Sequence, residues 1–287
     1  MVSILRSITF SNSRSGSASN GENSDMEQKL ISYVKTIFKY QNLLKELVVR
    51  DIKVRYRKSV LGLLWTVLNP LLMMTVITIV FSTIFKQSIP NFPIYFLSGS
   101  LIFSFNSEST SNALYSIISN ASLIKKVYIP KYLFPLSKIV SGLVNLGFSL
   151  IAMFIVMLFT NTPFYSTLLL LPIPIAYVFV FSTGLGLILS AATVFFRDIA
   201  HFYNVFILAW TYFTPIFYPA SILPEGAMAV MKLNPMYHYI NYVRDLLLNG
   251  VFPSIRENMI CMAISLITLT IGIIVFYRKQ DRFVLYI

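Results

Sequence analysis

Residues 60–85 read VLGLLWTVLNPLLMMTVITIVFSTIF and contain no charged side chain. This run is longer than the roughly 20 apolar residues that an α-helix needs to cross the hydrocarbon core of a bilayer. Directly before it, residues 43–60 (LLKELVVRDIKVRYRKSV) interleave apolar side chains with six Lys or Arg residues. That pattern predicts an amphipathic helix lying on the membrane surface, followed by a first span. The alternative is a basic stop at the membrane edge, with long side chains reaching to the headgroups.

The composition of the whole chain favours the bilayer as its solvent. The 287 residues are 56% hydrophobic and only 12% charged, with a mean hydropathy of +0.71, whereas soluble domains are about 25% charged. We therefore predict an all-α integral membrane protein with six transmembrane helices, at about 60–85, 93–118, 134–160, 166–195, 203–220 and 257–277. Pro172 and Pro174 divide the fourth segment, so its helix is expected to start nearer Ile175. The fifth segment is short and is closed by Pro215 and Pro219.

The Lys and Arg residues define an orientation. Eleven of the 23 lie within residues 1–60, and eight more fall on the same side of the predicted spans, namely Lys125, Lys126, Lys131, Lys138, Arg197, Arg278, Lys279 and Arg282. The opposite side keeps only Lys86, Lys232, Arg244 and Arg256. Because positive residues concentrate on the cytosolic side of membrane proteins, we expect both the N- and C-termini to be cytosolic.

Three regions follow from this pattern. Residues 1–30, rich in Ser, Asn and Gly between Ser11 and Asp25, are expected to form a disordered cytosolic leader. Residues 31–59 are expected to form cytosolic or interfacial amphipathic helices, and residues 60–287 the six-helix transmembrane domain. Between the last two spans, residues 220–256 hold apolar pieces of about ten residues broken by prolines. These pieces are too short to cross the membrane and predict re-entrant helices.

Several classes of function are excluded by missing motifs. None of the 11 glycines is followed by lysine, so the chain has no phosphate-binding P-loop. The net charge of +12 does not indicate nucleic acid, because the basic residues flank apolar spans. A single cysteine, Cys261, excludes an intramolecular disulfide, and the separated His201 and His238 lack a neighbouring ligand for a metal. We predict no catalytic residue, no metal site and no cofactor on this chain.

Two polar or aromatic clusters stand out inside the predicted spans. Glu108 is the one acid deep in a span, and it lies in the polar stretch SFNSESTSN, which also holds Asn106. Such a stretch either forms a wall of a translocation path or joins helices through hydrogen bonds. The aromatic cluster of the fifth span is either an interfacial anchor or a surface on which sugars stack. The candidate path residues are Phe103, Asn106, Glu108, Trp210, Tyr212 and Phe213.

With these features in place, the chain resembles ABC-2-type permeases of polysaccharide exporters, the family that exports O-antigen and that has teichoic-acid and capsule permeases as relatives. The similarity runs from about Leu43 to Ile287. It rests on the order and spacing of six segments: VVRDIKVRYRKSVLGLLWTVLNPLL (48–72), SNASLIKKVYIPKYLFPLS (119–137), FFRDI (195–199), TPIFYP (214–219), LNPMYHYINYVRDLL (233–247) and KQDRFVLYI (279–287).

The resemblance implies a bacterial plasma (inner) membrane protein that works as a homodimer with two copies of a separate ABC ATPase subunit, which would bind the ATP and Mg. It also implies export of a lipid-diphosphate-linked polysaccharide. The basic helix, with Arg50, Lys53, Arg55 and Arg57, would then lie at the cytosolic entrance, where cations suit a diphosphate headgroup. Contact with the ATPase would involve Leu123, Lys125, Lys126, Tyr128, Pro130, Lys131, Arg197 and Asp198. The Arg197–Asp198 pair is alternatively a stabiliser of a sharp turn.

One feature departs from the family pattern. Many relatives carry Pro-Trp in the second span, where this chain has Ile102-Phe103. Two other substrates fit the same architecture, namely teichoic acid and small hydrophobic drugs. A membrane-embedded glycan polymerase is a further alternative, but it needs carboxylates or a metal to activate a nucleophile. The acids beyond residue 60 are scattered over both sides of the membrane and show no paired arrangement.

Overall fold

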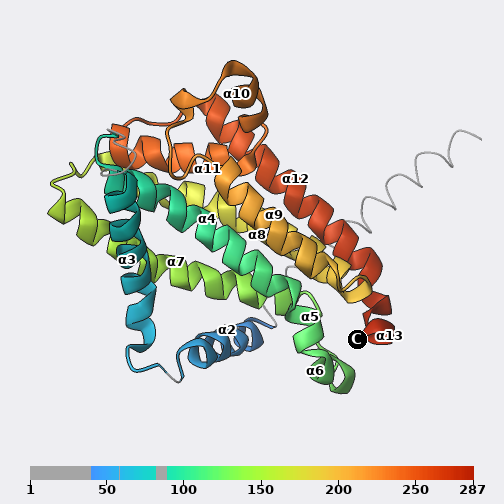
Figure 1. Ribbon diagram of the computed structural model, residues 1–287. Helices are drawn as coiled ribbons and strands as arrows, with labels where there is room; N and C mark the ends of the chain where they lie inside the picture. The colour runs from blue at the N-terminus through green and yellow to red at the C-terminus, as the bar shows by residue number, and fades with distance from the viewer. Residues whose placement is uncertain (1–39, 58, 82–88) are drawn as a thin grey trace, which may run out of the picture. The chain divides into compact units, whose positions relative to one another are not determined.

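The computed structural model describes residues 40–57, 59–81 and 89–287. Within these ranges every regular element is helical (Figure 1), which confirms the predicted all-α class. The predicted leader, residues 1–30, and the following residues up to 39 lie outside the described ranges. Residues 41–47 supply the first turns of α2 (Gln41–Tyr56), and residues 48–287 form one packed unit. Every contact described below lies within that unit.

Segment 43–60 forms a helix, as its pattern predicts, but the helix ends at Tyr56. The chain then turns at Gly62, whose φ of +51° lies in the left-handed region that glycine adopts without strain. A short 3₁₀ turn, η1 (Gly62–Leu64), leads into α3 (Trp65–Ile79), which buries only Thr66 inside the described chain. The apolar sides of α3 therefore remain open to lipid or to another protein.

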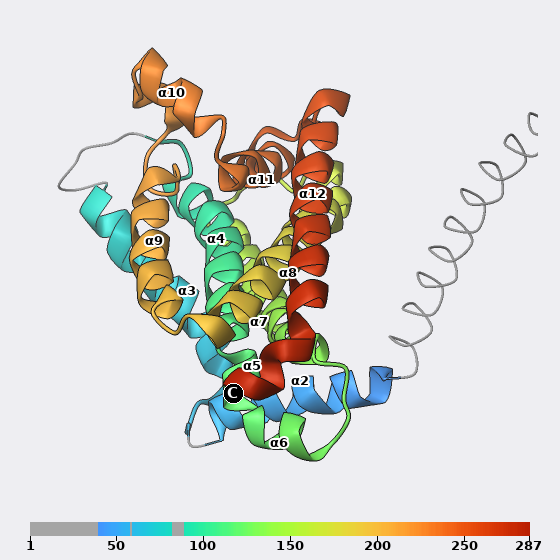
Figure 2. The same ribbon diagram turned by 90° about the vertical axis from the view of Figure 1, so that its right-hand side faces the viewer.

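The longer helices run alternately between two ends of the molecule, as Figure 2 shows. After α3 these are α4 (Phe92–Leu114), α7 (Leu133–Phe159), α8 (Pro172–Phe195), α9 (Ile199–Phe213) and α12 (Ile255–Lys279). At one end lie α5 (Ser116–Ser119), α6 (Ala121–Lys126), the 3₁₀ turn η6 (Gln280–Arg282) and α13 (Phe283–Tyr286). The opposite end carries α10 (Glu225–Met231) and α11 (Pro235–Arg244), with the 3₁₀ turns η3 (Ser166–Leu170) and η4 (Ala220–Ile222) and the π-helical turn η5 (Asp245–Asn249).

Among the described residues, four stretches are long and apolar enough to cross a membrane: Gly62–Ile79, Leu133–Phe159, Ser166–Phe195 and Ile255–Tyr286. They correspond to the predicted first, third, fourth and sixth spans. The predicted second span, 93–118, is helical as α4, but the polar stretch around Glu108 lowers its hydropathy. The predicted fifth span corresponds to α9, an apolar helix of only 15 residues.

Prolines explain where two helices differ from the predicted bounds. The predicted range 203–220 is wrong at both ends, since α9 starts at Ile199 and stops at Phe213. Thr214 adopts extended backbone (φ −96°, ψ 134°), because the residue before a proline is disfavoured in the α region. The expected start near Ile175 is also wrong. Helix α8 begins at Pro172, since a proline in the first turn has no N–H to leave unbonded.

Helix α4 lies at the centre of the packed unit. It packs against α7 and α8, and also contacts α9 and α11. More than half of its residues are buried, including the polar Asn106, Ser109 and Thr110. Ser182 of α8 donates a hydrogen bond to Asn106 Oδ1 (2.9 Å), and the hydroxyls of Thr110 and Tyr203 of α9 lie 2.6 Å apart. These bonds join helices through polar groups in a largely apolar core.

Candidate substrate entrance and coupling surface

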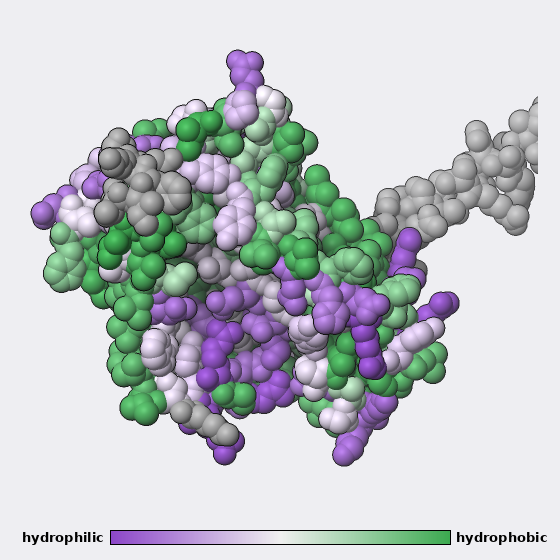
Figure 3. All heavy atoms as spheres, in the orientation of Figure 1, coloured by the Kyte–Doolittle hydropathy of each residue, from purple (hydrophilic) through white to green (hydrophobic). Residues whose placement is uncertain are grey.

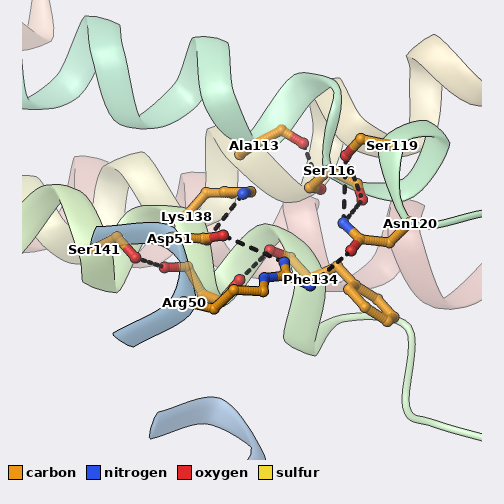
Figure 4. A network of polar contacts seen from close by, with 10 residues as sticks. Arg50, Asp51, Ala113, Ser116, Ser119, Asn120, Phe134, Lys138 and Ser141 are labelled. Carbon is orange, nitrogen blue, oxygen red and sulfur yellow. Dashed lines mark hydrogen bonds and ion pairs between the residues drawn. The ribbon is translucent and has the colours of Figure 1, made fainter. Parts of the chain in front are cut away.

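The second half of α2 is fixed to the rest of the chain by a polar network centred on Asp51 (Figure 4). The Asp51 carboxylate lies 2.8 Å from Lys138 Nζ of α7 and 3.2 Å from the Arg50 guanidinium. Arg50 in turn donates to the side-chain oxygen of Asn120 (3.3 Å). Asp51 and Lys138 are both largely buried, with side chains 12% and 21% exposed, so their attraction is less screened than that of a surface pair.

Asn120 extends this network to the α5–α6 turn. Its backbone lies outside the regular helical region (φ −109°, ψ 19°), and its side-chain amide donates to the Ser116 carbonyl (2.8 Å). An asparagine suits such a break because its side chain can replace backbone hydrogen bonds. Through Arg50 and Asn120, α2 is therefore joined to the segment that leads into α6.

A second ion pair lies one turn further along α2. Arg55 lies 3.3 Å from Glu108 of α4, with side chains 37% and 57% exposed. A pair this exposed contributes little stability. On α4, Glu108 shares one exposed face with Ser104 and Asn112, at the i, i+4 spacing of a helix, whereas Asn106 and Thr110 are buried on another side. The polar stretch thus has a buried face that joins α4 to α8 and α9 through hydrogen bonds, and a separate exposed face that carries Glu108.

Between α2, α4 and α7 lies a cleft of about 280 Å³. It is lined by Asp51, Ile52, Val54, Arg55, Asn112, Lys138, Ser141 and Asn145. In Figure 3 the lower half of this face carries a hollow of hydrophilic residues, with largely hydrophobic surface above it. We call this space the inner cleft. Both cations that line it, Arg55 and Lys138, are paired with a carboxylate.

The structure brings together part of the predicted entrance. Arg50 belongs to the polar network around Asp51, and Arg55 lines the inner cleft. Lys53 and Arg57 are exposed and do not line the cleft. Sequence reasoning missed Asp51 and Lys138 as members of the site. Both carry a signal in the sequence, since Asp51 is the one acid among the basic residues of 48–58 and Lys138 interrupts an apolar helix.

A larger cleft, of about 420 Å³, lies at the opposite end, beside α11 and η5. Arg244, at its wall, is only 6% exposed and lies 3.5 Å from the centre of the Tyr95 ring. It donates to the backbone carbonyls of Tyr95 and Ile216, each at 3.3 Å. Burial lowers the pKa of the Arg244 guanidinium to about 10, so it stays charged at neutral pH. These contacts fix α11 to α4 and to the turn after α9.

A family model of the ABC-2 type transporter matches residues 42–248, well over half of the chain. The chain belongs to the ABC-2 type transporter family. It is therefore an integral inner-membrane protein and, by family, part of an ABC transporter that works with an ATPase partner.

Named relatives align along most of their length with this ABC-2 chain. An O-antigen export system permease protein of Myxococcus xanthus is 32% identical over 257 residues, covering 88% of this chain and 98% of its own. A protein of the same name from Klebsiella pneumoniae is 30% identical, covering 84% and 93%. The polysialic acid transport protein of Escherichia coli is 22% identical, covering 82% and 92%.

The predicted path residues of this ABC-2 protein divide into two groups. Phe103, Asn106 and Trp210 are buried within the chain, and the Phe103 and Trp210 rings meet edge to face at 5.8 Å. Tyr212 and Phe213 are exposed at the end of α9, and Glu108 faces the region of the inner cleft. The buried group thus packs the core of one subunit, and the exposed group lies on its surface.

The predicted coupling residues of the ABC-2 chain gather at the end that carries α6 and α13 (Figure 2). The most accessible are Lys125, Lys126, Tyr128, Arg197 and Asp198, and Tyr128 is 96% exposed. Leu123 and Pro130 are half-buried. Lys131 instead points inward and donates to the Gln280 carbonyl (2.7 Å), which joins the loop after α6 to the end of the last long helix.

Proposed function

We propose that this chain is the permease subunit of an ABC exporter that moves lipid-linked polysaccharide, O-antigen-like or a related cell-surface glycan, from the cytosol across the plasma membrane. The transported chain would enter by its lipid diphosphate at the basic helix α2. No covalent chemistry would occur on this chain, because ATP and Mg would bind the ATPase subunit. The names of the relatives that align over almost their whole length support this substrate class.

The observation that carries the proposal is the placement of the α2 cations. Arg50 contacts the α5–α6 turn, Arg55 contacts α4, and Asp51 beside them contacts α7, at the end of the molecule that also bears the predicted coupling residues. A cationic entrance next to the ATPase contact would let nucleotide-driven movement of the loops reach the site where the headgroup binds. The chain Asn120–Arg50–Asp51–Lys138 is the physical route for that movement.

The complete transporter would contain two copies of this chain, each with six spans and with both termini cytosolic. The alternating directions of α3, α4, α7, α8, α9 and α12 support six crossings, with α10 and α11 re-entering from the outer side. Helices α3 and α9 bury few of their apolar residues inside one subunit. Their exposed faces are therefore available to line or close a path between two subunits.

The experiment is co-purification of the tagged chain from mild detergent with its ATPase, followed by transport of lipid-linked glycan into vesicles. The triple variant Lys125→Ala, Lys126→Ala, Tyr128→Ala should lose most of the bound ATPase and of the transport, since these side chains are exposed on the surface. A control on the opposite end, the double variant Glu225→Ala with Lys232→Ala, should leave ATPase binding intact.

Three results would contradict the proposal. A chain that never co-purifies with an ATPase expressed beside it is not an ABC permease subunit of this kind. ATPase activity stimulated by hydrophobic drugs and indifferent to lipid-linked glycan would assign a drug exporter. Loss of polymer synthesis on deleting the gene, instead of accumulation of finished polymer in the cytosol, would assign a glycan polymerase.

A further inference from the structure

The inner cleft contains two cations that come from separate helices. Lys138 projects from the first part of α7, and Arg55 from the last turn of α2. Each is held by one carboxylate, Lys138 by Asp51 and Arg55 by Glu108. The cleft is therefore nearly neutral as it stands, although its two cations suit an anion with more than one charge.

Lys138 depends on Asp51 for its charge partner more than Asp51 depends on Lys138. Asp51 has two cationic partners, Arg50 and Lys138, so it remains paired if Lys138 leaves. Within residues 40–57, 59–81 and 89–287, by contrast, Asp51 is the one carboxylate in salt-bridge contact with Lys138. The Lys138 side chain is only 21% exposed, and a cation with so little access to water is costly without a paired anion. Lys138 must therefore exchange Asp51 for another anion if it is to release it.

The rest of the cleft offers neutral polar groups. Asn112 of α4 and Asn145 and Ser141 of α7 line it. The side-chain oxygen of Asn145 is buried and makes no hydrogen bond within the described chain. Because a carboxamide can turn to present its N–H₂ group in place of its oxygen, Asn145 can supply donors to an oxyanion. Carbon side chains of Ile52 and Val54 complete one wall, beside the apolar membrane phase.

We propose that the inner cleft is a diphosphate site that opens by exchange of counter-ions. A substrate diphosphate takes Lys138 and Arg55 from Asp51 and Glu108. Asp51 then stays with Arg50, and Glu108, more than half exposed, is solvated by water. The inference rests on the proposed function, and it adds Lys138 as a phosphate-binding residue and the two carboxylates as competitors of the substrate.

The exchange also has a mechanical consequence. Asp51 is the link through which Lys138 holds α2 against α7, and Arg50 carries that link on to Asn120. When the diphosphate replaces Asp51 on Lys138 and Glu108 on Arg55, α2 loses its ion pairs to α7 and α4 and keeps its bond to the α5–α6 turn. Binding of the headgroup would thus release α2 from α4 and α7 but not from the α5–α6 turn.

The test measures binding of farnesyl diphosphate to the permease–ATPase complex in nanodiscs. Asp51→Asn removes the competing charge and should tighten binding roughly fivefold, whereas Lys138→Met should weaken it roughly tenfold. Lys138→Arg should bind close to the parent, and the double variant should match Lys138→Met. Arg278→Met, which removes an exposed cation at the end of α12, is the control for net charge and should have no effect.

Competitors separate the possible sources of the phosphate. Inorganic pyrophosphate should displace farnesyl diphosphate, and phosphatidylglycerol at the same concentration should not. Equal competition by phosphatidylglycerol would overturn the assignment to a diphosphate. Parent-like binding in Lys138→Met, or weaker binding in Asp51→Asn with unchanged thermal stability, would overturn the site itself. ATPase co-purification is scored on the same samples, so failure of the site is distinguished from failure of the exporter assignment.

Discussion

Single polar side chains connect several segments at the end of the core that carries α10 and α11. Asn234 is the fullest case, because its oxygen accepts from Trp210 Nε1 (2.8 Å) and from the Met236 N–H (3.0 Å), which caps α11. Its amide nitrogen donates to Thr214 Oγ1 (3.0 Å). One side chain thus satisfies an indole, a helix start and a helix end, all within an apolar environment where an unmet polar group is costly.

Arg244 also connects several segments, in this case through a charged side chain. Its guanidinium contacts the Tyr95 ring and two backbone carbonyls, and within the described residues it forms no salt bridge. The Ile216 carbonyl lies in the irregular turn after α9, where the backbone is no longer helical. The planar group can reach both carbonyls and stack on the ring at once.

Replacement of Arg244 by lysine should therefore destabilise the fold although the charge is kept. An ammonium cannot stack on Tyr95 and donate to both carbonyls, so we expect a loss of about 2 kcal/mol in the free energy of unfolding. Thermal unfolding of the purified protein in detergent measures it. The control, Arg256→Lys in the exposed first turn of α12, should change stability by less than about 0.5 kcal/mol. An Arg244→Lys protein as stable as the parent would show that charge alone is required.

At the scale of helices, the contact between α8 and α12 depends on two glycines. A Cβ built on Gly184 would lie 2.5 Å from backbone atoms of Thr268 and Leu269. One built on Gly272 would overlap the backbone of Gly184. The two helices approach so closely because neither has a side chain at the crossing, as is common where helices pack within a membrane.

Gly184→Ala and Gly272→Ala should each force α8 and α12 apart and lower stability by about 1–3 kcal/mol. Gly147→Ala on α7 is the matched control, since a Cβ there has open space within 4 Å, and alanine favours the helix. The melting temperatures of the three variants measure this loss of stability. Equal melting temperatures for the Gly184→Ala, Gly272→Ala and Gly147→Ala proteins would show that α8 and α12 have room for a side chain at their crossing.

The sequence predicted elements better than it predicted contacts. The apolar runs located α3, α7, α8 and α12, because burial in lipid demands a continuous stretch of fixed length. The predicted end of α9, residue 220, lies beyond Pro215, although the proline already forces Thr214 out of the helix. The pairing of Asp51 with Lys138 was not predictable, since 87 positions separate them and only the packing of α2 on α7 brings them together. The division of the polar stretch between two faces of α4 likewise needed the positions of α8 and α9.

For the molecule as a whole, the two ends should be accessible from opposite sides of the membrane. Cys261 is buried and is the one cysteine of the chain, so Cys261→Ala gives a background for labelling. In that background, Tyr128→Cys should react with a membrane-impermeant maleimide only after spheroplasts are opened. Ser221→Cys, at the end that carries α10, should react in intact spheroplasts. The reverse pattern would place the termini outside the cell and remove the cytosolic entrance.

The polar residues of α4 also affect how the chain is made. A helix that carries Asn106, Glu108 and Thr110 in its second half partitions poorly into lipid by itself. The partner of Asn106 is synthesised 76 residues later and that of Thr110 93 residues later. During translation α4 would therefore have to wait beside the insertion machinery, or at its lateral gate, until α8 and α9 emerge. A nascent chain stopped before residue 182 would hold α4 without those partners, exposed to quality-control proteases.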